Sequence, residues 1–251
     1  MPRIDKLKKI VSNNMGFIFI MSHMRSRSSL LSHILGSNPA ISGYYESRQS
    51  YLNWEDFARL RIHAYFDNTG KSNPKFALDS ILWNSYRISN QMCLEKKLKI
   101  IFLLREPEDT LKSIIYMGNK IGDQNFKDPD WALKYYCDRV KTIKDYYASR
   151  IPYQNGLFID SDKIIQHTDY LLKRLSNWLE LEVELSSNYL IFKHTGKKGY
   201  GDPLDNIKKG RIIKNKTDYQ GINISPSILH KAKAVHDSCK KMLLKTYESI
   251  S

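Results

Sequence analysis

Two short segments carry the residues whose types and spacing point most clearly to chemistry. The first spans residues 25–29 and directly precedes the helical spacing Leu30-Leu31-x-x-Ile34-Leu35. It brings together two guanidinium groups and three hydroxyls, those of Arg25, Arg27, Ser26, Ser28 and Ser29. The N–H groups at a helix N-terminus bind phosphate, and arginine and serine side chains add charge and further donors. The segment therefore predicts an anion-binding loop; the alternative is a serine cap beside arginines that face solvent.

The second segment begins at Arg105, which ends an apolar run, and continues to Ser113 eight residues later. Pro107 suits the first turn of a helix, and the acidic pair Glu108 and Asp109 suits its positive end. Ser113 then lies about two turns into that helix. Arg105 and Ser113 can together hold one phosphate along the helix flank, although an arginine at a strand end is more often a structural ion pair.

Apolar runs alternate with helical patterns and define the elements that position these segments. Runs at residues 16–21 and 99–104 are typical of strands buried on both faces of a parallel sheet. Shorter strands are expected at residues 40–41, 76–78 and 156–160, and helices at residues 54–66, 130–149, 168–179 and 226–249. This alternation predicts an α/β fold with a central parallel sheet and right-handed crossovers. Ligands bind where loops leave the carboxyl ends of such strands.

Residues 193–218 interrupt the alternation with a segment rich in glycine and lysine. Long loops within compact domains are usually functional or disordered. Residues 1–14 are expected to form a basic lead-in and residues 226–249 a C-terminal helix. Because no repeat or clean linker divides the chain, we expect residues 1–251 to form a single domain.

Composition excludes several classes of protein. The chain has 251 residues, of which 41% are hydrophobic and 26% charged, and this balance excludes a mainly disordered protein. No stretch approaches the roughly 18 apolar residues of a membrane span, and residues 17–21 are too short for a signal-peptide core. We therefore expect a cytoplasmic protein. Three distant cysteines and seven histidines without a ligand spacing predict neither disulfides nor a bound metal.

Charge narrows the class of partner. Forty basic residues against 26 acidic ones give a net charge of +14, which favours nucleic acid, an acidic membrane or a phosphorylated or sulfated small molecule. A lysine-rich genome also produces basic proteins without a functional reason. A non-enzymatic nucleic-acid-binding module is one alternative, with tyrosine pairs at 44–45, 135–136 and 146–147 as candidates for base stacking.

Common nucleotide motifs are absent from the expected positions. A Walker A loop requires GxxxxGK[ST] directly after a strand. Gly70-Lys71-Ser72 follows a helical stretch instead, and Tyr65 stands where the first glycine should be. No GxGxxG follows either main strand. The alternative enzyme is a kinase-like phosphotransferase that uses ATP, but the missing Walker lysine argues against it.

Together, the two anion-binding segments resemble the signatures of sulfotransferases that use 3′-phosphoadenosine 5′-phosphosulfate (PAPS). In that family a strand-loop-helix of the form [KR]-S-G-[ST]-T holds the 5′-phosphosulfate, and residues 25–29 are similar to it. The second signature, R-x-P-x-x-x-x-x-S, binds the 3′-phosphate, and Arg105, Pro107 and Ser113 match it. The likeness is to the bacterial, carbohydrate and tyrosylprotein branch and spans about residues 16–211.

This resemblance implies a P-loop-like three-layer α/β fold and transfer of a sulfuryl group from PAPS to a hydroxyl of a sugar, lipid or natural product. The product of the donor would be 3′,5′-phosphoadenosine (PAP), and no metal would be needed. The donor-binding residues that it implies are Arg25, Ser26, Arg27, Ser28, Ser29, Arg105, Ser113, Lys208, Lys209, Gly210 and Arg211. The last four belong to a basic loop that closes over the donor.

The resemblance also implies the catalytic residues. Glu46-Ser47-Arg48 is similar to a Glu-Thr-Arg stretch whose glutamate acts as general base. Glu46 would then accept the proton of the acceptor hydroxyl, with Arg48 orienting it or neutralising charge. Arg25 would stabilise the leaving phosphate.

Two positions depart from the family pattern. Arg27 replaces the glycine of the first loop, where glycine allows a positive φ. Ser80 stands where many relatives carry a lysine, and Lys75 or Arg48 are candidates to replace its charge.

Overall fold

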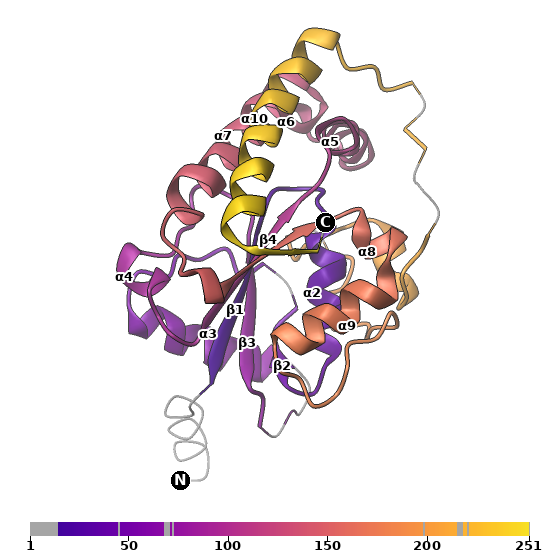
Figure 1. The fold of residues 1–251 in the computed structure, drawn as a ribbon. Coiled ribbons are helices and arrows are strands. Elements are labelled where there is room, and N and C mark those ends of the chain that lie inside the picture. The colour runs from indigo at the N-terminus through magenta and orange to yellow at the C-terminus, as the bar shows by residue number, and fades with distance from the viewer. Residues whose placement is uncertain are drawn as a thin grey trace.

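A computed structural model describes residues 15–44, 46–67, 71, 73–197, 199–214, 218–219 and 221–250. The expected lead-in at residues 1–14 lies outside these ranges. Six strands form one sheet in the order β2-β3-β1-β4-β5-β6 (Figure 1). Their bounds are β1 Gly16–Ser22, β2 Ile41–Ser42, β3 Phe76–Ile81, β4 Leu98–Leu104, β5 Gly156–Asp160 and β6 Glu248–Ile250. Every pair of neighbouring strands is parallel, which confirms the predicted parallel sheet.

The central strand β1 fixes where the loops emerge. All seven of its residues are buried, and it pairs with β3 and β4 through registers such as Phe17 with Ala77 and Phe17 with Leu98. The carboxyl ends of β1, β3, β4 and β5 therefore meet at one edge of the sheet. The segments at residues 25–29 and at Arg105 both leave from that edge.

Helices cover both faces of the sheet. The α-helices are α2 Ser28–Ser37, α3 Trp54–Asp67, α4 Asn90–Cys93, α5 Pro107–Ile121, α6 Gln124–Lys127, α7 Pro129–Thr142, α8 Lys163–Gln166, α9 Thr168–Trp178 and α10 Pro226–Thr246. Shorter helical turns are η1 Ile143–Tyr147, η2 Tyr153–Asn155 and η3 Asp205–Lys209.

Alternate residues of β1 face two separate cores. Phe17 and Phe19 pack in a core with side chains of α3, α5, α7 and α10, whereas Ile18 and Ile20 pack with side chains of α2, α8 and α9. In Figure 1, α5, α7 and α10 accordingly lie on one side of the sheet and α2, α8 and α9 on the other. The expected three-layer arrangement is confirmed.

The end of the chain corrects one prediction. The helix expected over residues 226–249 ends at Thr246, and Glu248–Ile250 pairs with β5 as a sixth strand. Tyr247 causes the change, because its backbone is extended and its hydroxyl donates to the carbonyls of Ala148 (2.8 Å) and Ile151 (3.0 Å). Its ring lies against Gly156, where any Cβ would come within 2.4 Å of it.

The residues behind two alternative functions have structural roles. The Lys71 ammonium, which belongs to the partial Walker sequence, donates to the carbonyls of Gly36, Asn38 and Ile41. One tyrosine of each pair is buried and so cannot stack on a base, namely Tyr44, Tyr136 and Tyr147; Tyr45 lies outside the described residues.

The described ranges also lack two other features. None of their helices is long and apolar enough to cross a membrane. They likewise contain no cluster of three or more histidine, cysteine or acidic side chains arranged to hold a metal.

Candidate active site

The loop between β1 and α2 adopts the conformation that favours glycine, although its residues are arginines. Arg25 has φ 62° and Arg27 has φ 69°, both in the left-handed region. Such a conformation costs about 1–2 kcal/mol for a residue with a side chain. Arg27 is held there by Asp162, 2.7 Å away, and by the Ser161 hydroxyl at 3.0 Å. Arg27 therefore adopts a backbone conformation that glycine would reach without strain.

Buried hydroxyls fix the base of the same loop. The Ser22 hydroxyl donates to the Leu103 carbonyl (2.6 Å) and lies 2.5 Å from the Ser26 hydroxyl. Ser26 is fully buried, so its hydroxyl braces the loop and does not reach the cavity. Ser28 and Ser29, in contrast, begin α2 and line the cavity. Of the three serines, only these two present their side chains to a ligand there.

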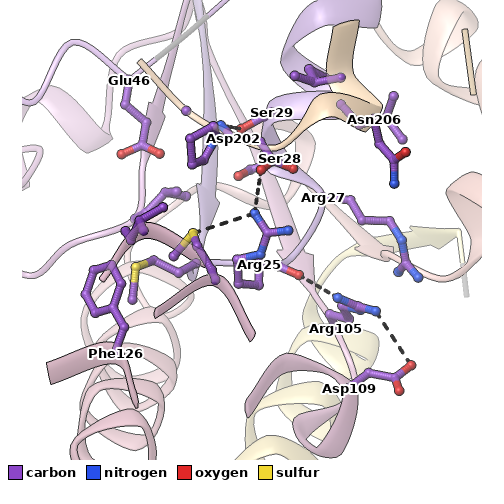
Figure 2. Close-up of a pocket in the computed structure, with 18 of the residues that line it drawn as sticks. Arg25, Arg27, Ser28, Ser29, Glu46, Arg105, Asp109, Phe126, Asp202 and Asn206 are labelled. Carbon is purple, nitrogen blue, oxygen red and sulfur yellow. Dashed lines mark hydrogen bonds and ion pairs between the residues drawn. The ribbon is translucent and has the colours of Figure 1, made fainter. Parts of the chain in front are cut away.

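The two arginine segments meet directly, as expected from the sheet topology (Figure 2). Arg25 Nε donates to the Ser113 hydroxyl at 2.9 Å across 88 residues of sequence. Arg105 donates through its NH1 to the carbonyl of Arg25 (3.0 Å), and its NH2 lies 3.7 Å from Asp109. Arg105 is only 6% exposed, and its Nε has no hydrogen-bond partner among the described residues. A buried guanidinium with an unused donor fits a phosphate ligand.

His23 joins these segments and was not identified from the sequence. Its Nδ1 lies 2.9 Å from the Met24 carbonyl, and its Nε2 lies 3.2 Å from the backbone nitrogen of Arg105. An amide N–H donates, so Nε2 accepts and Nδ1 carries the proton. Burial lowers the pKa of His23 to about 3, which keeps the ring neutral. His23 thereby sets the position of Arg105 relative to the first loop.

Arg139 is a second buried residue that holds the edge of the sheet. Its Nε donates to the Ser22 carbonyl (2.7 Å), and its NH2 donates to the Ile81 carbonyl. Its NH1 donates to the Asn84 side chain at 3.1 Å. The guanidinium therefore ties together the carboxyl ends of β1 and β3.

Glu46 lines the cavity on the side of β3. Burial raises its pKa to about 7; Arg48 and Arg139 oppose that shift, and Asp79 adds to it. A carboxyl with this pKa can accept a proton near neutral pH. Arg48 is exposed and lines the same cavity.

Asp79 anchors the segment that carries Glu46. Its carboxylate accepts from the backbone nitrogens of Ser47 (2.9 Å) and Ser80 (2.7 Å), and from the hydroxyls of Ser47 and Tyr51. Burial raises the pKa of Asp79 to about 6, although these hydrogen bonds favour its charged form. Asp79 thus holds the backbone of Ser47 before Arg48 and the side chain of Tyr51 after it. Lys75, the other candidate for the missing family lysine, instead binds the Glu180 carbonyl at 2.9 Å.

The C-terminal loop reaches the cavity through residues other than those expected. Of the predicted basic group, Arg211 lines the cavity, whereas Lys208, Lys209 and Gly210 do not. Ile207 points inward from η3 and is 4% exposed, which directs its neighbours Lys208 and Lys209 to solvent. The Lys208 ammonium pairs with Asp205 at 3.0 Å. Donor contacts from Lys208, Lys209 and Gly210 therefore stay a prediction, which would require this loop to move toward the cavity.

The loop instead places Asp202 and Tyr219 on the two arginine segments. Asp202 pairs with Arg25 at 2.8 Å, and its backbone nitrogen donates to the Ser29 hydroxyl at 2.9 Å. Gly201 permits this approach, because its φ is 111° and a Cβ would lie 2.8 Å from Ser29 Oγ. Burial raises the pKa of Tyr219, but Arg105 and hydrogen bonds to Ser113 and Arg105 lower it below its ordinary value.

Arg25, Arg105, Glu46, Asp202 and Tyr219 line a cavity of about 770 Å³ at the carboxyl edge of the sheet, and Ser113 lies fully buried behind Arg25. Ligand sites usually have volumes of about 300–1,000 Å³, so a nucleotide and a second small molecule can share this one. The arrangement can bind two anionic groups, one at Arg25 and one at Arg105, and it holds a carboxyl with a pKa near 7 in the same space.

Comparisons with known proteins point to one fold. No protein-family model matches the chain, and no curated protein matches it either. Several solved structures are similar, among them two sulfotransferase domains. A sulfotransferase domain from the curacin biosynthetic pathway has a TM-score of 0.63 and 14% identity, covering 91% of this chain and 99% of that one. A sulfotransferase domain from the olefin synthase of Synechococcus PCC 7002 has a TM-score of 0.62 and 14% identity, covering 90% and 95%. The chain therefore resembles sulfotransferase domains in its fold over most of its length.

Proposed function

We propose that this protein is a sulfotransferase that transfers a sulfuryl group from PAPS to an acceptor hydroxyl. The observation that carries the proposal is the hydrogen bond from Arg25 to Ser113, with Arg105 bound to the carbonyl of Arg25. It joins the two segments that resemble the 5′-phosphosulfate and 3′-phosphate signatures. Two anion sites linked in this way suit a nucleotide with phosphates on both its 3′ and 5′ positions.

The donor supplies the sulfuryl group, and the chain supplies the groups that hold it. We assign Ser28, Ser29 and the N-terminus of α2 to the 5′-phosphate. Arg105 and Ser113 are assigned to the 3′-phosphate, which distinguishes PAPS from ordinary nucleotides. Arg25, between the two segments, stabilises the negative charge that develops on the leaving phosphate oxygen. Arg27 adds positive charge at the same loop.

Glu46 is assigned as the general base for the acceptor hydroxyl. Its pKa near 7 gives it an appreciable ionised fraction at neutral pH while it retains the strength to accept a proton. Arg48 lies on the same cavity and favours the charged form of Glu46. Positioning and electrostatic stabilisation then account for most of the rate, as they do in phosphoryl transfer.

The acceptor is proposed to be a hydroxyl of a sugar, lipid or natural product. Both similar structures are domains named for biosynthetic systems, the curacin pathway and an olefin synthase. A small-molecule acceptor is consistent with the space that remains beside Glu46.

The proposal is tested by transfer of ³⁵S from labelled PAPS to a panel of alcohols and sugars. We expect a labelled product together with PAP. Arg105→Ala should raise the KM for PAPS by about 10- to 100-fold, the effect of losing a hydrogen bond to a charged group. Arg174→Ala, at an exposed arginine paired with Glu248, is the control and should leave that KM unchanged. Phosphate transfer from ATP without any use of PAPS would contradict the proposal.

A further inference from the structure

The cavity has two chemically different sides. Figure 2 shows Arg27 and Asn206 on one side of Arg25, and Glu46 and Phe126 on the other. Beyond Glu46 the cavity lining is mainly apolar. It comes from the loop after β3, from the C-terminal part of α5, and from α6. Its apolar members are Leu82, Trp83, Tyr86, Met117, Ile121 and Phe126. We call these six residues the apolar wall.

A row of aromatic rings in contact, two pairs tilted and one stacked, supports the apolar wall. The ring of Trp83 lies 4.9 Å from that of Tyr135, which stacks on Trp131 at 5.6 Å with an interplanar angle of 4°. Trp131 in turn lies 5.1 Å from Phe126. Because side chains in contact with a packed core keep their positions, the wall presents a preformed surface to a ligand.

Two polar side chains near the apolar wall, Tyr135 and Asp123, already have hydrogen-bond partners. The Tyr135 hydroxyl accepts from the backbone nitrogen of Met24 (2.7 Å) and donates to the Leu82 carbonyl (2.8 Å). The carboxylate of Asp123, which also lines this side, accepts from the backbone nitrogens of Asn125 and Phe126. The other polar groups on this side are Arg48, the exposed Ser85, and the single polar atoms of the Trp83 and Tyr86 rings. These are few for the several hydroxyls of a sugar, whereas a hydrocarbon requires none of them.

We infer that the acceptor is an alcohol whose hydroxyl is carried on an extended hydrocarbon portion, which lies against Trp83, Ile121 and Phe126. This inference rests on the proposed function and narrows its acceptors from sugars to apolar alcohols. The acceptor oxygen, placed at Glu46, forms a bond to sulfur, and the bond between sulfur and the 5′-phosphate oxygen breaks. The electron pair of that bond leaves on PAP, and the hydroxyl proton passes to Glu46.

A homologous series of acceptors tests the inference on the unmodified protein. We expect kcat/KM to rise about three- to fourfold for each added methylene from 1-butanol to 1-decanol, the increment for burying one methylene. Glucose and N-acetylglucosamine should be used at a rate below that of 1-butanol. An equal kcat/KM for all the alcohols, or a higher kcat/KM for a sugar than for 1-decanol, would overturn the inference. Transfer to a sugar would still leave the proposed function in place.

A matched pair of variants locates the effect. Ile121→Asn places an amide on the apolar wall and should reduce the increment per methylene to less than twofold. Leu244→Asn makes a similar change at a side chain of α10 that is 43% exposed and outside the cavity, and it should keep the full increment. An unaltered increment in Ile121→Asn would place the hydrocarbon elsewhere.

Direct binding separates this inference from the proposed function. Titration calorimetry should detect 1-decanol binding to the wild-type protein, and weaker binding to Ile121→Asn. Binding of 1-decanol without any binding of PAP would overturn the proposed function and the acceptor role with it. Binding of PAP without any gain from 1-butanol to 1-decanol would overturn the inference alone.

Discussion

The Glu46 carboxyl has a pKa near 7 because it is largely removed from water. If it is the general base, kcat/KM should rise with pH up to about 7 and then level off, as the ionised form becomes the main one. Glu46→Gln should lower turnover by about 10²–10⁴ and lose this pH dependence, while the Kd for PAP stays the same. Glu180→Gln, at an exposed carboxylate paired with Lys75, is the control. Near-normal turnover in Glu46→Gln would remove this residue from the mechanism.

The raised pKa of Glu46 also predicts how the stability of the protein depends on pH. The folded pKa of Glu46 is raised from 4.5, so the protonated carboxyl favours the folded state below that pH, and the benefit is lost as pH rises through about 7. Glu46→Gln should therefore be more stable than the wild type at pH 8, by about 1–2 kcal/mol after allowance for its partial exposure. At pH 4 the two proteins should unfold at similar temperatures. Thermal unfolding at both pH values checks this, and an equal difference at both would contradict it.

At Arg27, a residue with a side chain occupies a left-handed backbone conformation that suits glycine, which should lower the free energy of unfolding. Arg27→Gly and Arg27→Ala both remove the ion pair with Asp162, but only alanine keeps a Cβ at φ 69°. We expect the glycine variant to be the more stable by about 1 kcal/mol, or roughly 2–4 °C in Tm. The same pair of substitutions at the exposed helical residue Arg59 should give the opposite order. An alanine variant at 27 as stable as the glycine variant would contradict a strained loop.

The loop that carries Asp202 is expected to compete with a bound donor for Arg25. Asp202 places a carboxylate on Arg25, where the donor's charged group is proposed to bind. Asp202→Asn should therefore tighten PAP binding by about two- to fivefold, since a partly exposed ion pair contributes up to about 1 kcal/mol. Asp205→Asn changes a neighbouring exposed carboxylate of the same loop and should leave the Kd unchanged. Calorimetric titration of both variants with PAP measures the difference, and weaker binding to Asp202→Asn would show that the carboxylate assists the ligand.

Elements with a strong local pattern were predictable from the sequence. The apolar runs of β1 and β4 and the start of α5 at Pro107 were identified because each depends on neighbouring residues. The short strand β6 was not, since it depends on how Tyr247 packs against Gly156 far away in the sequence. The direction of Lys208 and Lys209 likewise depends on the burial of Ile207, which no local pattern reports.

At the scale of the whole molecule, the site is assembled from loops that the sheet brings together. The meeting of Arg25 with Ser113 could be predicted because both follow parallel strands that end at one edge. His23, Arg139 and Tyr219 could not be predicted, because each has partners more than 50 residues away in the sequence and lacks a recognisable motif. Motifs therefore identified the groups suited to bind a ligand, and the fold identified those that hold them in place.

The most direct test of the proposed function is thermal unfolding with PAP, with AMP and ATP as controls. At about 100 times its Kd, a ligand stabilises the folded state by roughly 2.7 kcal/mol, which is about 5–10 °C for a chain of this length. We expect this shift with PAP and not with AMP or ATP, and its loss in Arg105→Ala but not in Arg174→Ala. An equal or larger shift with ATP, or no shift with PAP, would contradict a site built for a nucleotide with a 3′-phosphate.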